Sequence, residues 1–411
     1  MSRGTQQSPV SLDARSRRDL DVRDDLDVAD FFDHELPHLA RERSHLAVPG
    51  ARELGIESCT FGTPEGAWTL SVDLDADAVR VERGDSGVAR IELDADEVRR
   101  LVDDRITPMT LVAAGKVRAT RGDLGDFLDW WVVLRALVDG RAVHTAGSID
   151  FVDRDGAPLD LQRSFTPADS DADLAHFLAQ AGFLHLRGWF DTDAMDAISH
   201  DIDTALPRYA PDDGRSWWAR TSDGTHRAVR LQGFDAHSST AADLLASDAF
   251  ARIGALTGDG HISVGTVEAL EKPLGVVEGI SDLPWHKDCS LGMHSYTCSG
   301  LTIGISVTGA DATSGQLAVV PGSHRALVQP AFHRREWGLP PRPLPTRTGD
   351  VTVHCSCTLH MSHAPTDRER RVLYTSFRLP PLDPSLVDHQ VAIDVVREAA
   401  YKKVDQPSRT P

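Results

Sequence analysis

The stretch that decides the fold is RTGDVTVHCSCTLHMSHAPTDRERRVLYTSFRL, residues Arg347 to Leu379. It alternates short runs of β-branched and aromatic residues with Gly, Pro, Asp and Ser, a pattern typical of short strands joined by turns. The same alternation of short strand-like runs and turn residues begins at the strand-like FLHLRG, far upstream, and continues to about Leu379, and it favours a β-sandwich or barrel over a doubly wound sheet. The sequence contains no GxGxxG, P-loop or GxSxG motif, which argues against a dinucleotide, a nucleoside triphosphate or an α/β-hydrolase nucleophile.

Histidine and aspartate residues in this region are spaced as metal ligands could be. The upstream stretch DLPWHKDCSLGMH carries His286 and Asp288, and residues i and i+2 of a strand point to the same side. The stretch quoted first carries His354, His360 and His363, which the pattern predicts to lie on one later strand. Two histidines and one carboxylate on one face of a metal, with the other positions open, are typical of non-haem Fe(II) oxygenases. This pattern alone does not choose among the three later histidines.

Composition limits the class of protein and its partners. The chain has 411 residues, of which 62 are acidic and 43 basic, and its net charge of −19 disfavours nucleic acid and anionic membranes as partners. No apolar run approaches membrane-spanning length, and the N-terminus lacks a signal-peptide core. The cysteines are few, odd in number and without CxxC spacing, which predicts a reducing cytoplasm. They are Cys59, Cys289, Cys298, Cys355 and Cys357, and the pair Cys355 and Cys357 is interpreted as small buried residues.

The N-terminal region has a pattern of its own. The alternating segments AWTLSVDLD, AVRVER and VARIEL predict an antiparallel meander, and DADEVRRLVDDR predicts a helix opened by acidic residues. GKVRATRGD predicts a further strand, and LGDFLDWWVVLRALVDG predicts an apolar helix that ends at Gly140. This order of elements resembles the sterol carrier protein type 2 fold, which implies an apolar tunnel. The alternative is that the apolar helix is simply core.

A second resemblance is more specific. Five blocks occur in order between about residues 173 and 382: AGFLHLRGWF, WHKD, TSGQLAVVPGSHR, GDVTVH and the H-x-S that begins at His360. They resemble the phytanoyl-CoA dioxygenase family of Fe(II)/2-oxoglutarate oxygenases. The resemblance implies a double-stranded β-helix, or jelly roll, and it implies His286, Asp288 and His360 as catalytic metal ligands, in preference to His354 and His363. The implied cofactors are Fe(II), 2-oxoglutarate as co-substrate and O2.

The same resemblance implies the co-substrate site. The arginine of the family lies eleven residues beyond the distal histidine, which selects Arg371 over Arg370. The strand period supports that choice, because it places Arg371 on one face of RVLYTSF and Arg370 on the other. Ser362 and Lys272 are further candidates for contact with the co-substrate. The chain departs from the HGSxxN pattern of relatives by reading HMSHAP, and for His324 in PGSHR a structural turn is favoured over a ligand role.

The expected organisation and function follow. We expect a disordered lead-in (residues 1–29), an α+β domain (30–145), a linker (146–165), an oxygenase jelly roll with flanking helices (166–385), and a C-terminal helix and tail (386–411). The expected reaction is Fe(II)- and 2-oxoglutarate-dependent hydroxylation, or a related oxidation, of a small organic metabolite, with natural-product and acyl substrates both open. Halogenation is not expected, because halogenating relatives carry a small residue where this chain has Asp288. Trp217, Trp218 and Arg220 are candidates for a substrate lid or for packing.

Two alternatives remain beside this expectation. One is a non-catalytic protein that retains the metal and binds a lipid or another small molecule. The other is a Zn²⁺ or Mn²⁺ hydrolase or isomerase on a cupin-like scaffold, which would have no carboxylate co-substrate for an arginine to hold. A small-molecule substrate is the expected partner, and a homo-oligomer is left open.

Overall fold

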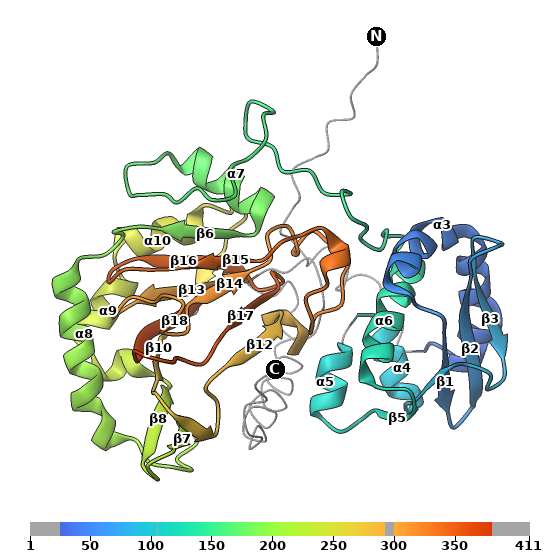
Figure 1. Ribbon diagram of the computed structural model, residues 1–411, viewed down its shortest axis with the longest axis horizontal. Coiled ribbons are helices and arrows are strands. Elements are labelled where there is room, and N and C mark those ends of the chain that lie inside the picture. The colour runs from blue at the N-terminus through green and yellow to red at the C-terminus, as the bar shows by residue number, and fades with distance from the viewer. Residues whose placement is uncertain (1–24, 105, 292–299, 380–411) are drawn as a thin grey trace.

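The computed structural model describes residues 25–104, 106–291 and 300–379, which form two units that lie side by side (Figure 1). The expected C-terminal helix and tail (386–411) and most of the expected lead-in lie outside these ranges. Residues 146–165, the expected linker, contain no helix or strand. Within the described residues, none of the helices combines the length and apolarity needed to cross a bilayer.

The N-terminal unit consists of one sheet covered by helices. Its sheet has the order β3-β2-β1-β4-β5. The strands are β1 (Ser58–Thr63), β2 (Gly66–Asp73), β3 (Ala78–Arg83), β4 (Ala89–Glu92) and β5 (Arg118–Arg121). The helices are α2 (Val28–Asp30), the π-helical η1 (Phe31–Glu35), α3 (Leu36–Leu54), α4 (Ala95–Val102), α5 (Pro108–Ala113) and α6 (Leu124–Asp139).

The expected meander is wrong in one respect. β4 does not pair with β3; it pairs in parallel with β1, a strand that the sequence pattern did not indicate. The apolar helix forms where expected: Asp123 provides a capping box at its start, and Gly140 ends it in the left-handed conformation with φ 64°. Trp130 and Trp131 of α6 are fully buried in the core of this unit. The resemblance of this unit to the sterol carrier fold is not shown.

The second unit contains two antiparallel sheets. The larger sheet has the order β11-β7-β8-β10-β18-β13-β16-β6, with β9 paired to β18, and the smaller has the order β12-β17-β14-β15. The larger comprises β6 (Phe183–Leu186), β7 (Ser216–Thr221), β8 (His226–Leu231), β9 (Ile262–Ser263), β10 (Glu268–Lys272), β11 (Val276–Glu278), β13 (Gly300–Ser306), β16 (Val351–Cys355) and β18 (Arg370–Arg378). The smaller comprises β12 (Leu283–His286), β14 (Leu317–Val319), β15 (Arg342–Leu344) and β17 (His360–Ser362). These sheets are consistent with the expected jelly roll.

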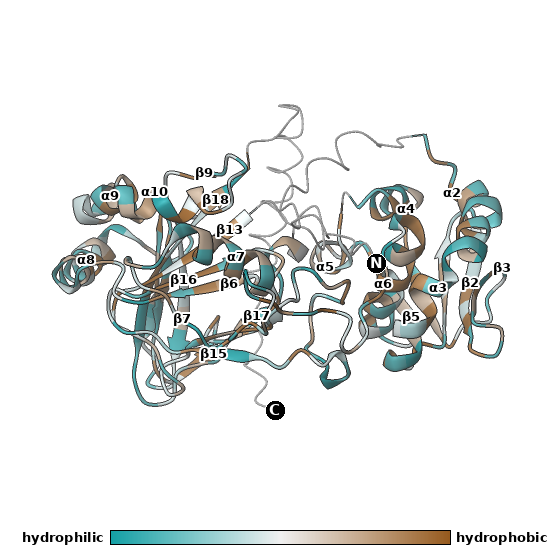
Figure 2. Cartoon of the chain, turned by 90° about the horizontal axis from the view of Figure 1, so that it is seen from above, coloured by the Kyte–Doolittle hydropathy of each residue, from teal (hydrophilic) through white to brown (hydrophobic). Residues whose placement is uncertain are grey.

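Helices cover the outer side of the larger sheet. They are α7 (Asp171–Ala181), α8 (Thr192–Ala205), α9 (Ser239–Leu245) and α10 (Asp248–Ala255), and Figure 2 shows α8, α9 and α10 on the side of the sheet away from the N-terminal unit. The ring of Phe250 in α10 stacks on Phe377 of β18 at 4.7 Å between centroids. The helices therefore bury one face of the sheet and leave its other face for the site described below.

The two units are in direct contact. Asp129 of α6 forms an ion pair with Arg334, in the loop that follows β14, and the backbone N–H of His144 donates to the carbonyl of Leu327. Helix α5 also contacts the 3₁₀ turn η4 (Asp288–Leu291) of the second unit. The N-terminal unit therefore packs beside the segment that carries Asp288.

Candidate metal centre and substrate cavity

Two histidines face each other across the smaller sheet. His286 ends β12 and His360 begins β17, and these residues are direct partners in the antiparallel register. Their ring centroids lie 4.2 Å apart. The strand pairing therefore brings together two residues that are 74 positions apart in the sequence.

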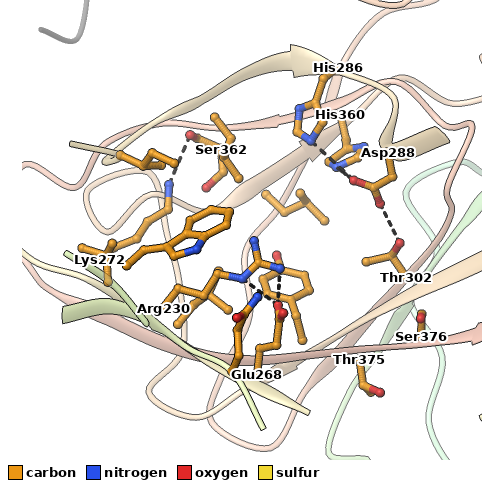
Figure 3. Close-up of a pocket in the computed structure, with 18 of the residues that line it drawn as sticks. Arg230, Glu268, Lys272, His286, Asp288, Thr302, His360, Ser362, Thr375 and Ser376 are labelled. Carbon is orange, nitrogen blue, oxygen red and sulfur yellow. Dashed lines mark hydrogen bonds and ion pairs between the residues drawn. The ribbon is translucent and has the colours of Figure 1, made fainter. Parts of the chain in front are cut away.

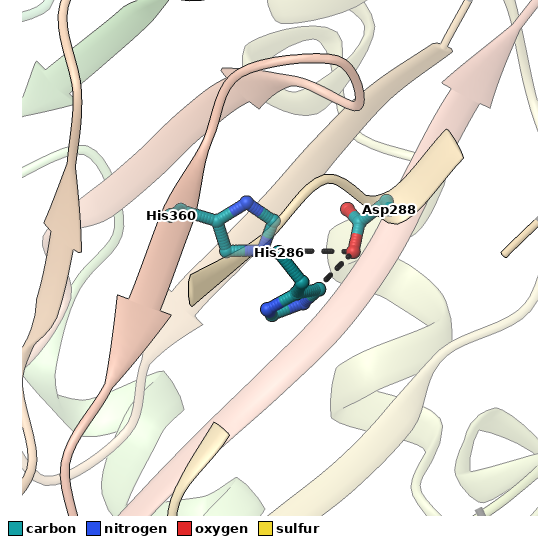
Figure 4. Close-up of side chains that lie close together, drawn as sticks. All are labelled: His286, Asp288 and His360. Atoms are coloured by element: carbon teal, nitrogen blue, oxygen red, sulfur yellow. Dashed lines mark ion pairs between the residues drawn. The ribbon is translucent and has the colours of Figure 1, made fainter. Parts of the chain in front are cut away.

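Asp288 completes the group, although not from a strand. β12 ends at His286, and Asp288 begins η4, so the expected i, i+2 placement on one strand is wrong. The turn still directs the carboxylate toward the histidines: Oδ1 of Asp288 lies 3.5 Å from Nε2 of both His286 and His360 (Figure 4). One potential ligand atom from each of the three residues lies within 4.8 Å of the others.

Backbone carbonyls orient both imidazoles. Nδ1 of His286 lies 2.8 Å from the carbonyl oxygen of Pro284, and Nδ1 of His360 lies 2.9 Å from that of Thr358. When each Nδ1–H donates to its carbonyl, the lone pair of each Nε2 is directed at the shared space, as metal-binding histidines require. Burial and the neighbouring imidazoles hold the pKa of His360 well below its usual value, which keeps it neutral. Two neutral imidazoles and one carboxylate fit a divalent first-row metal such as Fe(II).

Burial by itself would raise the pKa of the Asp288 carboxyl. The adjacent imidazoles, that of His360 first and then those of His286 and His354, outweigh that effect and hold this pKa well below the ordinary value. Asp288 is therefore ionised at neutral pH, and it offers one negative charge to a cation held between the histidines.

The expected single strand through the three later histidines is wrong. His354 lies on β16 of the larger sheet, His360 lies on β17 of the smaller sheet, and His363 is exposed beyond the end of β17. A turn separates β16 from β17, so the chain crosses between the sheets. His354 nevertheless lies near the group, with its ring centroid 4.2 Å from that of His360.

The histidines and Asp288 line one side of a cavity of about 450 Å³. In Figure 3 the cavity lies between them and the labelled pair of Arg230 and Glu268. Nε of Arg230 donates to Oε2 of Glu268 at 2.8 Å, and the guanidinium lies 4.2 Å from the ring centroid of Trp217. Sequence patterns did not indicate Arg230 or Glu268, because an Arg and a Glu on separate strands carry no local signal. Of the candidate lid residues, Trp217 lines the cavity, whereas Arg220 pairs with exposed Glu278.

A second polar cluster adjoins the metal group. Nζ of Lys272 donates to the carbonyls of Ser362 and His363, at 3.2 and 2.8 Å. Arg370 is buried and donates to the carbonyl of Gly315 at 2.6 Å, and one of its Nη atoms lies 3.5 Å from Oγ of Ser362. Burial first, and then the positive charge of Arg370, hold the pKa of Lys272 well below its usual value. Neither side chain forms an ion pair with a carboxylate in the described ranges, so an incoming anion would find N–H donors here without a competing carboxylate.

Arg371, the arginine implied for the co-substrate, contacts other groups of the protein in this structure. Nε of Arg371 lies 2.7 Å from Glu271, and one Nη donates to the carbonyl of Ser199 in α8 at 2.9 Å. Arg371 does not line the cavity, and it lies on the face of β18 that carries Phe377 toward the helices. Residues 363–369 form a loop between β17 and β18, so a count of residues from His360 does not determine which face of β18 an arginine occupies.

The remaining residues singled out in the sequence are His324, Cys355, Cys357 and Ser362. Nε2 of His324 is 3.0 Å from the carbonyl oxygen of Ala179, and burial lowers its pKa to about 4. Cys355 and Cys357 are buried, in agreement with their expected role as small buried residues. The hydroxyl of Ser362, expected to contact the co-substrate, donates to the carbonyl of Gly315 at 2.8 Å.

Comparison with known proteins identifies the domain that holds this site. Residues 178–372 match the family model described as phytanoyl-CoA dioxygenase (PhyH). No curated protein matches the chain with significance. Among solved structures, AviO1 from Streptomyces viridochromogenes aligns with 20% identity and a TM-score of 0.43, over 52% of this chain and 97% of AviO1. The non-heme alpha ketoglutarate dependent epimerase SnoN aligns with 21% identity and a TM-score of 0.42, over 52% and 84% of the two chains. EctD from S. alaskensis, solved with 2-oxoglutarate and 5-hydroxyectoine, aligns with 18% identity and a TM-score of 0.43, over 57% and 86%.

Proposed function

Because residues 178–372 form a phytanoyl-CoA dioxygenase domain, we propose that this protein is an Fe(II)- and 2-oxoglutarate-dependent dioxygenase that hydroxylates a small polar metabolite. The observation that carries the proposal is one cavity that joins two distinct features. One is the group His286, Asp288 and His360; the other is Lys272, which lines the same cavity, together with buried Arg370, which lies behind the cavity residue Ser362 with one Nη 3.5 Å from its Oγ. A metal and a dicarboxylate co-substrate would require both features together.

Each residue has a stated role in this proposal. His286 and His360 supply neutral nitrogens, and Asp288 supplies the charged oxygen that balances part of the metal charge. Arg370 holds the distal carboxylate of 2-oxoglutarate, with Lys272 beside it as a second cation. Bound Fe(II) supplies the redox chemistry: O2 and 2-oxoglutarate are consumed, succinate and CO2 leave, and one oxygen atom enters the substrate.

The far end of the cavity supports a polar substrate. Arg230 and Glu268 present charged groups there, and both Arg230 contacts to Glu268 use the same oxygen, Oε2. The other carboxylate oxygen and part of the guanidinium therefore remain available to a ligand. An acyl chain placed against these groups would desolvate them without replacing their hydrogen bonds, which is costly. We therefore favour a small polar metabolite over an acyl substrate.

The test is a turnover assay on the purified full-length chain. The protein is incubated with Fe(II), ascorbate and 2-oxoglutarate, with and without a pool of polar metabolites, and succinate and metabolite masses are measured. The proposal predicts succinate formation, stimulated by the pool, and one metabolite that gains one oxygen atom. Succinate with a product of unchanged mass would instead indicate an epimerisation, the reaction named for SnoN. No succinate under any condition would favour the non-catalytic binding protein.

A further inference from the structure

The two carboxylate oxygens of Asp288 have different neighbours. Oδ1 faces Nε2 of His286 and His360, as described above. Oδ2 accepts a hydrogen bond from the hydroxyl of Thr302 at 2.6 Å, and Nε2 of His354 lies 3.4 Å from it. Thr302 on β13 and His354 on β16 are direct partners in the antiparallel register, so one rung of the larger sheet presents both groups to Oδ2.

We propose that His354 is a positioning residue that, together with Thr302, holds Oδ2 of Asp288 so that only Oδ1 faces the metal. This inference rests on the proposed metal site. A carboxylate held by one oxygen occupies one coordination position, whereas a carboxylate that binds through both oxygens occupies two. Positioning by His354 would therefore leave room at a bound metal for a bidentate co-substrate together with O2.

Burial argues against a purely structural role for His354. Its side chain is 1% exposed, and neither ring nitrogen forms a regular hydrogen bond within the described part of the chain. A buried imidazole without partners is costly, whereas an apolar ring would fill the same space without that cost. His354 also lines the cavity, whereas its strand neighbours Val353 and Cys355 lie in the core beneath the helices. A small movement of Asp288 toward a metal-loaded position would allow Nε2–H to donate to Oδ2.

The other groups around Oδ2 are consistent with this role. An oxygen of a carboxylate can accept two hydrogen bonds, so the Thr302 hydroxyl and the His354 ring do not exclude each other. The hydroxyl of Thr302 is in turn 3.3 Å from that of Ser356, which limits its rotation. Outer partners of this kind typically change metal affinity by about 10- to 100-fold when they are removed.

The test uses the full-length apoprotein and Co(II), whose visible spectrum reports its coordination. His354→Phe keeps the ring volume and removes both nitrogens, whereas His354→Gln places an amide N–H near the position of Nε2. We expect His354→Phe to weaken Co(II) binding by about 10- to 100-fold and to change the visible bands. His354→Gln should restore most of the affinity and the wild-type bands. His363→Phe, at an exposed histidine of the same region, is the matched control and should bind like wild type.

Several outcomes would overturn the proposal. Wild-type affinity and bands in His354→Phe would show that the ring nitrogens are not used. Failure of His354→Gln to restore binding would point to lost packing or to direct ligation by His354. If His354→Phe does not fold, His354→Asn replaces it, because its shorter amide does not reach Oδ2; equal binding by the Asn and Gln variants would contradict the role. His286→Ala tests the metal site itself. Wild-type Co(II) affinity in that variant would contradict the proposed metal site, and not only the role of His354.

Discussion

At the scale of single residues, the metal group depends on atoms that are not ligands. The carbonyls of Pro284 and Thr358 set the orientation of the two imidazoles, and the register of β12 with β17 sets their separation. A substitution of a ligand removes a donor atom, whereas a substitution elsewhere in the loop leaves the donor set intact.

We expect His286→Ala, Asp288→Ala and His360→Ala each to abolish succinate formation, because two remaining donors hold a divalent metal too weakly. His363→Ala should retain it, since His363 is exposed and lies outside the cavity. Succinate formation from 2-oxoglutarate in the presence of Fe(II) is the measurement. Activity close to wild type in the His360 variant would contradict the ligand assignment.

The two adjacent arginines should behave differently. Arg370→Gln removes a cation beside Lys272 and Ser362, so the concentration of 2-oxoglutarate needed for half-maximal turnover should rise by roughly tenfold or more, the loss of a charge-assisted contact. Arg371→Gln removes contacts to Glu271 and Ser199, so it should lower Tm and leave that concentration nearly unchanged. The reverse result, with the larger kinetic effect at Arg371, would support Arg371 as the co-substrate arginine, the role that the family resemblance implied for it.

At the scale of elements, the packing of α10 on β18 depends on one glycine. A Cβ atom at Gly254 would overlap the ring of Phe377, which is buried and stacked on Phe250. β18 carries Arg370 and part of the cavity wall, so this contact supports the site from behind. The close approach of helix to sheet is thus a consequence of a residue without a side chain.

Gly254→Ala should therefore lower Tm, although alanine is the better helix former. The overlap is expected to cost about 1–3 kcal/mol, which exceeds or offsets the gain in helix propensity of about 1 kcal/mol. Ala251→Ser, at an exposed position of the same helix, is the control and should change Tm little. A higher Tm in Gly254→Ala than in wild type would show that Phe377 moves aside readily.

At the scale of the whole molecule, the N-terminal unit is coupled to the oxygenase unit by a buried acid. Burial raises the pKa of Asp129 to about 6, and the neighbouring Arg334 opposes that rise. Because the folded-state pKa lies above the ordinary value of 3.8, the folded protein takes up this proton at a higher pH than the unfolded chain does. The contribution of Asp129 to stability is therefore least favourable above pH 6 and improves as pH falls toward 4.

Asp129→Asn removes this titration. The Tm of wild type minus that of Asp129→Asn should increase as pH falls from 7 to 4, with most of the change around and below pH 6. Asp196→Asn, at an exposed acid of α8, serves as the control, and its Tm difference from wild type should not follow the same curve. A difference for Asp129→Asn that stays constant over this range would show that the carboxyl does not titrate there.

The sequence by itself determined the family of the second unit and the residue types of its metal group. The blocks around WHKD and the H-x-S at His360 are short continuous motifs, so they can be recognised from the sequence alone. The resemblance to the phytanoyl-CoA dioxygenase family is confirmed for residues 178–372. Strands and helices with a strong period, such as β3 and α6, were likewise visible, because backbone periodicity is a short-range property. Helix α3 was not expected, and it contains Pro49, a residue that usually ends a helix.

Only the tertiary structure decided what depends on strand phase and on contacts between distant segments. The loop between β17 and β18 carries no periodicity, so the face occupied by Arg370 and Arg371 followed from packing against α8 and α10 and not from counting. The parallel pairing of β4 with β1 and the meeting of Arg230 with Glu268 likewise join residues on separate strands. The approach of His354 to Asp288 depends on the gap between two sheets, a distance that is set by the whole core and by no local stretch of sequence.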